Sequence, residues 1–113
     1  MLSVVIPSLG GKALNNTISS LNSGSVIPDE ILVSLPSLES MNFVEVSDQN
    51  VRLLNANCYS QVGQRIYGFK MAQFDYVLQL DDDVILDNNC IEILMDAMKK
   101  TNMSSFSPYY INL

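Results

Sequence analysis

The sequence predicts an α/β fold, built on a mostly parallel sheet with helices on both of its faces. Its apolar runs are short and continuous, as in strands that are buried on both sides. Between them lie segments whose apolar residues recur at i, i+4 and i+7, the spacing of amphipathic helices. With 113 residues, 48% of them hydrophobic, the chain is expected to form one domain over residues 1–113 with a substantial core.

The first third of the chain reads as strand, helix and strand. Residues 2–6 are rich in β-branched side chains and predict a strand, which the Pro7–Gly11 turn closes. Apolar residues at helical spacing within 14–21 predict a helix that ends near Gly24. The apolar run 31–35 predicts the second strand, because a proline follows it directly.

The middle of the chain predicts two more strands and a second long helix. Phe43, Val44 and Val46 are compatible with a short edge strand, and residues 51–54 with a further strand. Ser60 is a suitable N-cap for the helix that follows.

Three apolar residues of this helix, Val62, Ile66 and Phe69, recur at i, i+4 and i+7 and predict its buried face. Gly63 and Gly68 are expected to let the same helix approach the sheet or a ligand closely.

The last third predicts a strand over 76–80 and a final helix. Asp87, Asn88 or Asn89 can cap that helix, and Lys99-Lys100 suits its C-terminal end. Its inner face is expected to carry four apolar side chains, Ile91, Leu94, Met95 and Met98.

Composition excludes several classes of function. The chain has no histidine, so Ser-His-Asp and Cys-His catalysis and the common zinc sites are absent. A formal net charge of −6 argues against a nucleic-acid-binding surface. Cys58 and Cys90 are expected to be free thiols of a reducing compartment.

The N-terminal run lacks the basic start of a signal peptide, and no stretch is long and apolar enough to span a membrane. A cytoplasmic location is therefore expected, with peripheral association at the inner membrane face left open.

The acidic triplet Asp81-Asp82-Asp83 follows directly on the predicted strand 76–80. Adjacent carboxylates repel one another, and a bound divalent cation is a common reason for such a cluster. Ligands of α/β sheets bind beyond the carboxyl ends of the strands, and the turns after Ile6 and Leu35 are expected on the same rim. This placement favours a metal-assisted phosphate site, against the alternative of a solvated acidic turn.

Four segments in order resemble the nucleotide-sugar-binding half of a family 2 glycosyltransferase with the Rossmann-like GT-A fold. Residues 4–8 resemble the family's first strand and proline-containing loop, and 30–34 its second strand. Residues 61–68 resemble the helix that carries an Arg before a Gly, and 76–83 the strand that ends in the DXD motif. The resemblance covers roughly residues 1–100, and the ordered set is more specific than DXD alone.

The resemblance implies roles for individual residues. Asp81 is similar to the DXD aspartate that contacts the donor, and Asp81 and Asp83 are the implied metal ligands, for Mn²⁺ or Mg²⁺. Asp82 occupies the variable position within the donor site, and Arg65 is similar to the basic residue near the nucleotide.

Pro7 and Ser8 match the loop beside the base and ribose. Ser34 stands where the family usually has a base-reading aspartate, which is a departure from its pattern. The implied donor is a nucleotide-diphospho-sugar, with a UDP-sugar as the first expectation.

The implied activity is sugar transfer, of the hexosyltransferase type, in polysaccharide or glycoconjugate synthesis. The resemblance implies that a family domain continues beyond the DXD strand to supply the acceptor site and the general base, so we expect this chain to be a truncated domain, and the sequence assigns no catalytic residue. A homodimer through the apolar segment 106–113 is also compatible with the sequence.

Two alternatives remain open at this point. One is a non-catalytic GT-A remnant that acts as a binding or assembly module, which the short length favours. The other is a nucleotidyltransferase, although Lys12 is the only basic residue in the first loop, where a triphosphate site is normally glycine-rich and basic.

Overall fold

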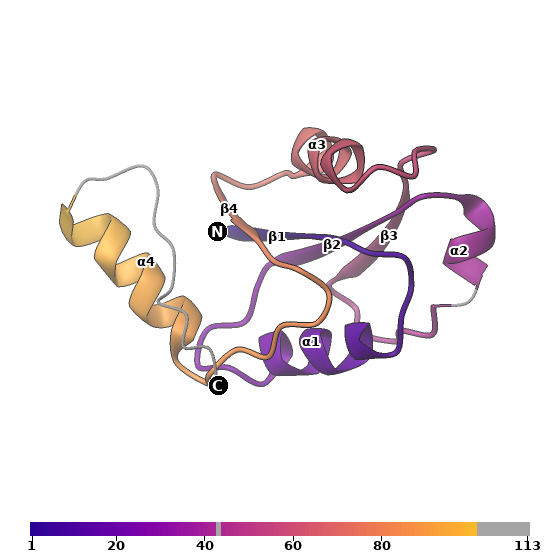
Figure 1. The fold of residues 1–113 in the computed structure, drawn as a ribbon. Coiled ribbons are helices and arrows are strands. Elements are labelled where there is room, and N and C mark those ends of the chain that lie inside the picture. The colour runs from indigo at the N-terminus through magenta and orange to yellow at the C-terminus, as the bar shows by residue number, and fades with distance from the viewer. Residues whose placement is uncertain (43, 102–113) are drawn as a thin grey trace.

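A computed structural model describes residues 1–42 and 44–101. Strands and helices alternate through this part of the chain, as Figure 1 shows. Their order is β1 (Leu2–Pro7), α1 (Ala13–Asn22), β2 (Glu30–Leu35), α2 (Leu38–Asn42), β3 (Val51–Asn55), α3 (Gln61–Met71), β4 (Tyr76–Gln79) and α4 (Cys90–Thr101). The predicted α/β class is confirmed. The four strands predicted at residues 2–6, 31–35, 51–54 and 76–80 correspond to β1, β2, β3 and β4.

The sheet has the strand order β3-β2-β1-β4, and every pairing is parallel. Val4 of β1 pairs with Ile31 on one side and with Leu78 on the other. The central strands β1 and β2 are buried along their whole length, whereas β4 alternates between half-buried and exposed residues. The continuous apolar runs therefore belong to the strands covered on both faces.

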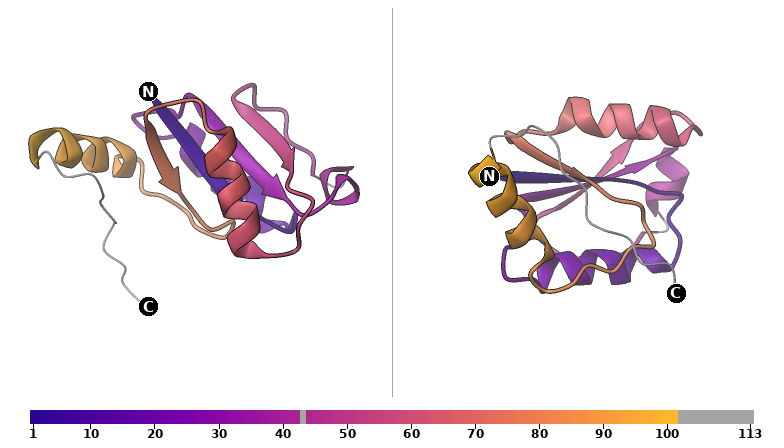
Figure 2. Two further views of the ribbon diagram at one scale, coloured as in Figure 1. Left: turned by 90° about the horizontal axis from the view of Figure 1, so that it is seen from above. Right: turned by 60° about the vertical axis from the view of Figure 1, so that its left-hand side comes forward.

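Helices α1 and α3 lie on opposite faces of the sheet (Figures 1 and 2). The larger core lies on the α1 face, where Leu14, Ile18 and Leu21 pack against strand residues such as Val4 and Ile6. A smaller cluster lies on the α3 face and consists of Val5, Leu32 and Leu54 with Tyr67, Met71 and Ala72. Two apolar layers on one sheet make the Rossmann-like arrangement.

The predicted buried face of α3 is wrong. Val62, Ile66 and Phe69 are 60%, 49% and 43% exposed. The opposite side of α3 lies on the sheet instead, with Gly68 against Val5, where an added Cβ would collide with the valine side chain. The missing side chain lets the helix backbone approach β1 closely, so the predicted role of Gly68 is confirmed.

The expected edge strand at residues 43–46 does not form in the described part of the chain. Val44 and Val46 are outside any strand and pack against the core from a loop, and Phe43 lies outside the described residues. The short helix α2 precedes this loop and was not predicted. The apolar segment 106–113, with the expected dimer contact, also lies outside the described residues.

Helix α4 lies beyond the β4 edge and covers neither face of the sheet in the way that α1 and α3 do (Figures 1 and 2). Ile91 is buried, while Leu94, Met95 and Met98 are half-buried. The face of α4 that was predicted to be the inner one is therefore the less exposed face, although only Ile91 is fully buried. Ser25 donates a hydrogen bond to Glu92 over 3.1 Å and links α4 to the loop after α1. Among residues 1–42 and 44–101, the structure contains no helix with the length and apolarity needed to cross a bilayer.

Candidate donor site at the strand ends

The carboxyl ends of β1, β2 and β4 meet at one rim of the sheet, as predicted. The Ser8 N–H donates to the carbonyl oxygen of Ser34 over 3.1 Å. The Ser8 hydroxyl donates to Oδ2 of Asp82 over 2.7 Å, across 74 positions of sequence. The parallel register therefore brings the first loop and the acidic triplet into direct contact.

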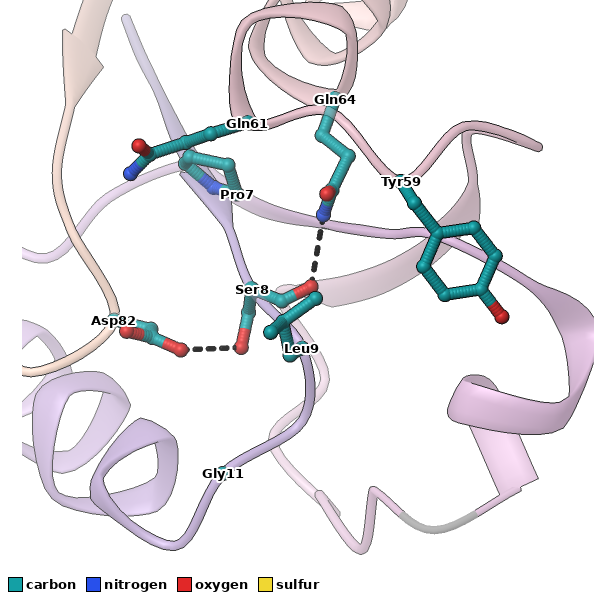
Figure 3. Close-up of a pocket in the computed structure, with 8 residues that line it drawn as sticks. All are labelled: Pro7, Ser8, Leu9, Gly11, Tyr59, Gln61, Gln64 and Asp82. Carbon is teal, nitrogen blue, oxygen red and sulfur yellow. Dashed lines mark hydrogen bonds between the residues drawn. The ribbon is translucent and has the colours of Figure 1, made fainter.

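A pocket with a cavity volume of about 370 Å³ opens at this rim. Its walls come from the loop after β1, the start of α3 and the triplet (Figure 3). They consist of Pro7, Ser8, Leu9, Gly11, Tyr59, Gln61, Gln64 and Asp82. In Figure 3, Asp82 and Tyr59 lie on opposite sides of the Ser8 loop, so the pocket has an acidic end and an aromatic end.

The Gln64 side chain links α3 to this rim through hydrogen bonds. The Gln64 side chain is only 2% exposed, and its amide nitrogen donates to the carbonyl oxygens of Ser8 and Ser34, over 2.8 Å in each case. Ser60 caps the same helix, because its hydroxyl accepts a hydrogen bond from the Gly63 N–H over 3.2 Å. The predicted N-cap is confirmed, and it places the first turn of α3 beside the pocket.

The three aspartates of the triplet have different surroundings. Asp82 is half-buried and lines the pocket, whereas Asp81 and Asp83 are exposed and lie outside the set of lining residues. In the described part of the chain, no three His, Cys, Asp or Glu side chains converge as a preformed metal cluster. The carboxylate oxygens of the triplet nevertheless suit Mg²⁺ or Mn²⁺, which commonly bind one or two carboxylates together with substrate phosphates.

Two other predicted residues lie near the pocket but not in its wall. Arg65 is half-buried, and the Gln79 amide, turned with its oxygen towards Arg65, accepts hydrogen bonds from Nε (3.0 Å) and Nη2 (3.1 Å). Ser34 is fully buried, and within the described residues its Oγ has no hydrogen-bond partner. Of the predicted site residues, the pocket wall thus contains Pro7, Ser8 and Asp82.

Sequence reasoning missed five lining residues, namely Leu9, Gly11, Tyr59, Gln61 and Gln64. Tyr59 carried a usable signal, because it is an aromatic residue in a strand-to-helix loop at the predicted rim. It is 78% exposed, and Leu9 is 71% exposed. Gln64 carried no such signal, since only the packing of α3 reveals that a glutamine is buried there.

Both cysteines are free thiols in the structure, in agreement with the prediction. Burial, followed by the negative charge of Asp87, raises the pKa of the Cys90 thiol at the start of α4. A raised pKa keeps a thiol protonated and therefore weakly nucleophilic at neutral pH. Cys90 also lies outside the wall of the pocket, so its thiol has no role in that site.

Comparison with known proteins identifies the family of the chain. The family model described as "Glycosyl transferase family 2" matches residues 3–112, nearly the whole chain, so the chain belongs to glycosyl transferase family 2. The search of curated proteins finds no match.

Among solved structures, the chain is similar to residues 1–349 of TarS from S. aureus, with a TM-score of 0.67 and 16% sequence identity. The match covers 89% of this chain and 33% of that one, so this chain spans about a third of the length of the TarS structure. At that identity, the similarity supports the fold alone.

Proposed function

We propose that this chain binds the nucleotide-sugar donor of a family 2 glycosyltransferase, which transfers the sugar to an acceptor. The observation that carries the proposal is the hydrogen bond between Ser8 and Asp82, which joins the first loop to the acidic triplet beside a pocket at the strand ends. A nucleoside diphosphate has a planar apolar end and a charged end. The pocket offers the aromatic side chain of Tyr59 at one end and, at the other, the Asp82 carboxylate, whose neighbours Asp81 and Asp83 are the proposed cation ligands.

Asp81 and Asp83 are the proposed ligands of a divalent cation, Mn²⁺ or Mg²⁺, which the donor diphosphate would share. Both carboxylates are exposed and therefore accessible to a cation from solvent. Such a cation, when bound, offsets the negative charge of the diphosphate. The chain itself holds the donor and orients it, while Asp82 remains engaged with Ser8.

Tyr59 and Leu9 are proposed to bind the nucleobase. A base has an apolar face that stacks on aromatic side chains, and Tyr59 is an exposed aromatic at the pocket. Ser34 takes the place of the family's base-reading aspartate, and its Oγ is without a partner in the described residues. UDP is the first nucleotide to test, because a UDP-sugar is the donor that the family resemblance implies.

Arg65 is proposed to lie near the donor diphosphate. Its guanidinium is next to Gln79, two residues before the triplet, and can add positive charge to a strongly acidic rim. The acceptor site and the general base are proposed to come from a part of the family domain beyond the segment described here.

Isothermal titration of UDP into the chain, with and without Mn²⁺, tests the donor site. We expect binding that depends on Mn²⁺, and a loss of affinity of more than about tenfold in Asp83→Asn, which removes a proposed metal ligand. Asp96→Asn is the matched control, because it removes the same charge from an exposed position on α4. Binding of neither Mn²⁺ nor UDP by the folded chain would instead favour a non-catalytic module.

The aromatic end of the pocket can be tested separately. Tyr59→Ala is expected to weaken UDP binding by roughly tenfold, because stacking on an aromatic ring contributes about 1–3 kcal/mol per base. Tyr59→Phe keeps the ring and should bind UDP with nearly the affinity of the unmodified chain. Equal losses in the two variants would show that the hydroxyl, and not stacking, makes the contact.

A further inference from the structure

Ser8 is an unusual residue for a ligand site, because its polar groups are already used within the protein. Its N–H donates to Ser34 over 3.1 Å, and its carbonyl accepts from Gln64 over 2.8 Å. Its hydroxyl donates to Asp82 over 2.7 Å and accepts from the Gly10 N–H over 2.9 Å. Since Ser8 is also only 4% exposed, it is better placed to organise the pocket than to contact a donor.

Asp82 is held at two points. Its Oδ2 accepts from Ser8, and its main-chain carbonyl accepts from the Thr17 hydroxyl of α1 over 3.0 Å. Fixing both the side chain and the main chain of the middle residue restricts the whole triplet. Asp81 and Asp83 on either side are exposed, and within residues 1–42 and 44–101 no comparable hydrogen bond fixes their side chains.

We propose that Ser8 and Asp82 form a positioning pair, here called the Ser8–Asp82 latch. Through it, the middle aspartate of the triplet orders the first loop and leaves Asp81 and Asp83 directed to the donor and cation. Asp82 is then a positioning residue and not a ligand. This inference rests on the proposed donor site, but the loop-ordering part can be measured without any ligand.

The physical basis is the strength of a hydrogen bond from a hydroxyl to a carboxylate. Such a bond is shorter and stronger than one between neutral groups, and the 2.7 Å separation agrees with it. The Ser8 hydroxyl also accepts from Gly10, whose φ of +87° places it in a backbone conformation that favours glycine. Loss of the Asp82 carboxylate should therefore weaken the hydrogen bond of the Gly10 N–H to the Ser8 hydroxyl. Asp82 and Gly10 are linked only through Ser8 in the described structure.

A double-mutant cycle on UDP affinity in the presence of Mn²⁺ distinguishes a latch from a ligand. Ser8→Ala and Asp82→Ala should each weaken binding by about tenfold, and the double variant should be no weaker than either single one, because both remove the same interaction. Asp82→Asn should recover most of the loss of Asp82→Ala, since an amide oxygen still accepts from Ser8. Additive losses, or an Asn variant as weak as the Ala variant, would overturn the latch.

The matched control is Ser20→Ala. The Ser20 hydroxyl also links α1 to the segment after the triplet, by accepting from the Leu86 N–H over 3.2 Å, but Ser20 is not in the pocket wall. This variant should lose stability without the loss of UDP affinity. Equal affinity losses in Ser20→Ala and Ser8→Ala would show that general loosening of the fold, and not the latch, is responsible.

Amide hydrogen exchange of Gly10 in the ligand-free chain completes the test. Asp82→Ala should speed this exchange, whereas Asp83→Asn should leave it unchanged. If the unmodified chain binds no UDP, the proposed donor site fails, and the Gly10 exchange still decides the latch. An exchange rate that is the same in Asp82→Ala and the unmodified chain would overturn it.

Discussion

At the scale of single residues, one buried amide organises the rim of the sheet. Gln64 donates to the carbonyl oxygens of Ser8, just after β1, and of Ser34, near the end of β2, so one side chain joins the ends of the two strands. Buried carbonyls without a partner cost free energy, because they lose their hydrogen bonds to water. This explains why a polar residue occupies the inner side of α3.

Gln64→Leu is expected to destabilise the chain by roughly 2 kcal/mol, because the leucine removes the hydrogen bond to the Ser8 carbonyl and one of the two hydrogen bonds that the Ser34 carbonyl accepts. Urea denaturation measures the free energy of unfolding. Gln61→Leu, an exposed glutamine in the same first turn, is the control and should change it by less than about 0.5 kcal/mol. Similar losses in the two variants would mean that the Gln64 hydrogen bonds contribute little.

At the scale of elements, the packing of α3 depends on the absence of a side chain. Gly68 faces Val5 at a distance that leaves no room for a Cβ. Glycine is normally unfavourable within a helix by about 1 kcal/mol relative to alanine. The close approach to β1 therefore outweighs the loss of helix propensity at this position.

Gly68→Ala is expected to lower the free energy of unfolding by about 1–3 kcal/mol, as in other overpacked cores, despite the better helix propensity of alanine. Gly11→Ala serves as the comparison, because a Cβ at Gly11 meets no atom within 4 Å. That variant should be neutral or slightly stabilising in thermal denaturation. A Gly68→Ala chain as stable as the unmodified one would contradict the close packing of α3 on Val5.

At the scale of the whole molecule, charge constrains how a donor is bound. The chain carries 12 acidic and 6 basic residues, for a formal net charge of −6 at pH 7. An anionic nucleoside diphosphate is repelled by such a chain, whereas a divalent cation is attracted to it. The strand-end rim, with three adjacent carboxylates, is where a bound divalent cation would offset most of the local negative charge.

Mn²⁺ affinity, measured by titration without nucleotide, should fall severalfold when NaCl rises from about 0.05 M to about 0.5 M, because salt screens exposed carboxylates. Asp83→Asn should weaken Mn²⁺ binding at every salt concentration. Asp96→Asn, which changes the net charge equally, should have only a small effect. An affinity that is independent of salt would contradict binding by the exposed Asp81 and Asp83.

Most of the fold was predictable because its signals are local. The strands β1 and β2 are covered on both faces, so apart from Glu30 at the start of β2 their residues are apolar or small. The rim was predictable as well, because parallel strands place their carboxyl ends together. The inner side of α3 was not predictable, since Val62, Ile66 and Phe69 recur at helical spacing on the exposed face, whereas the fully buried residues of the helix are Gln64 and Gly68.

The sequence by itself determined the positions of the four sheet strands and the three longer helices, the α/β class and the resemblance to family 2 glycosyltransferases, but not the short helix α2. These follow from periodicity, turn residues and motifs within short segments. Only the tertiary structure decided that Asp82 bonds to Ser8, that Gln64 joins two strand ends and that Tyr59 lines the pocket. Those contacts join residues that are distant along the chain, and their geometry depends on how closely α3 packs against the sheet.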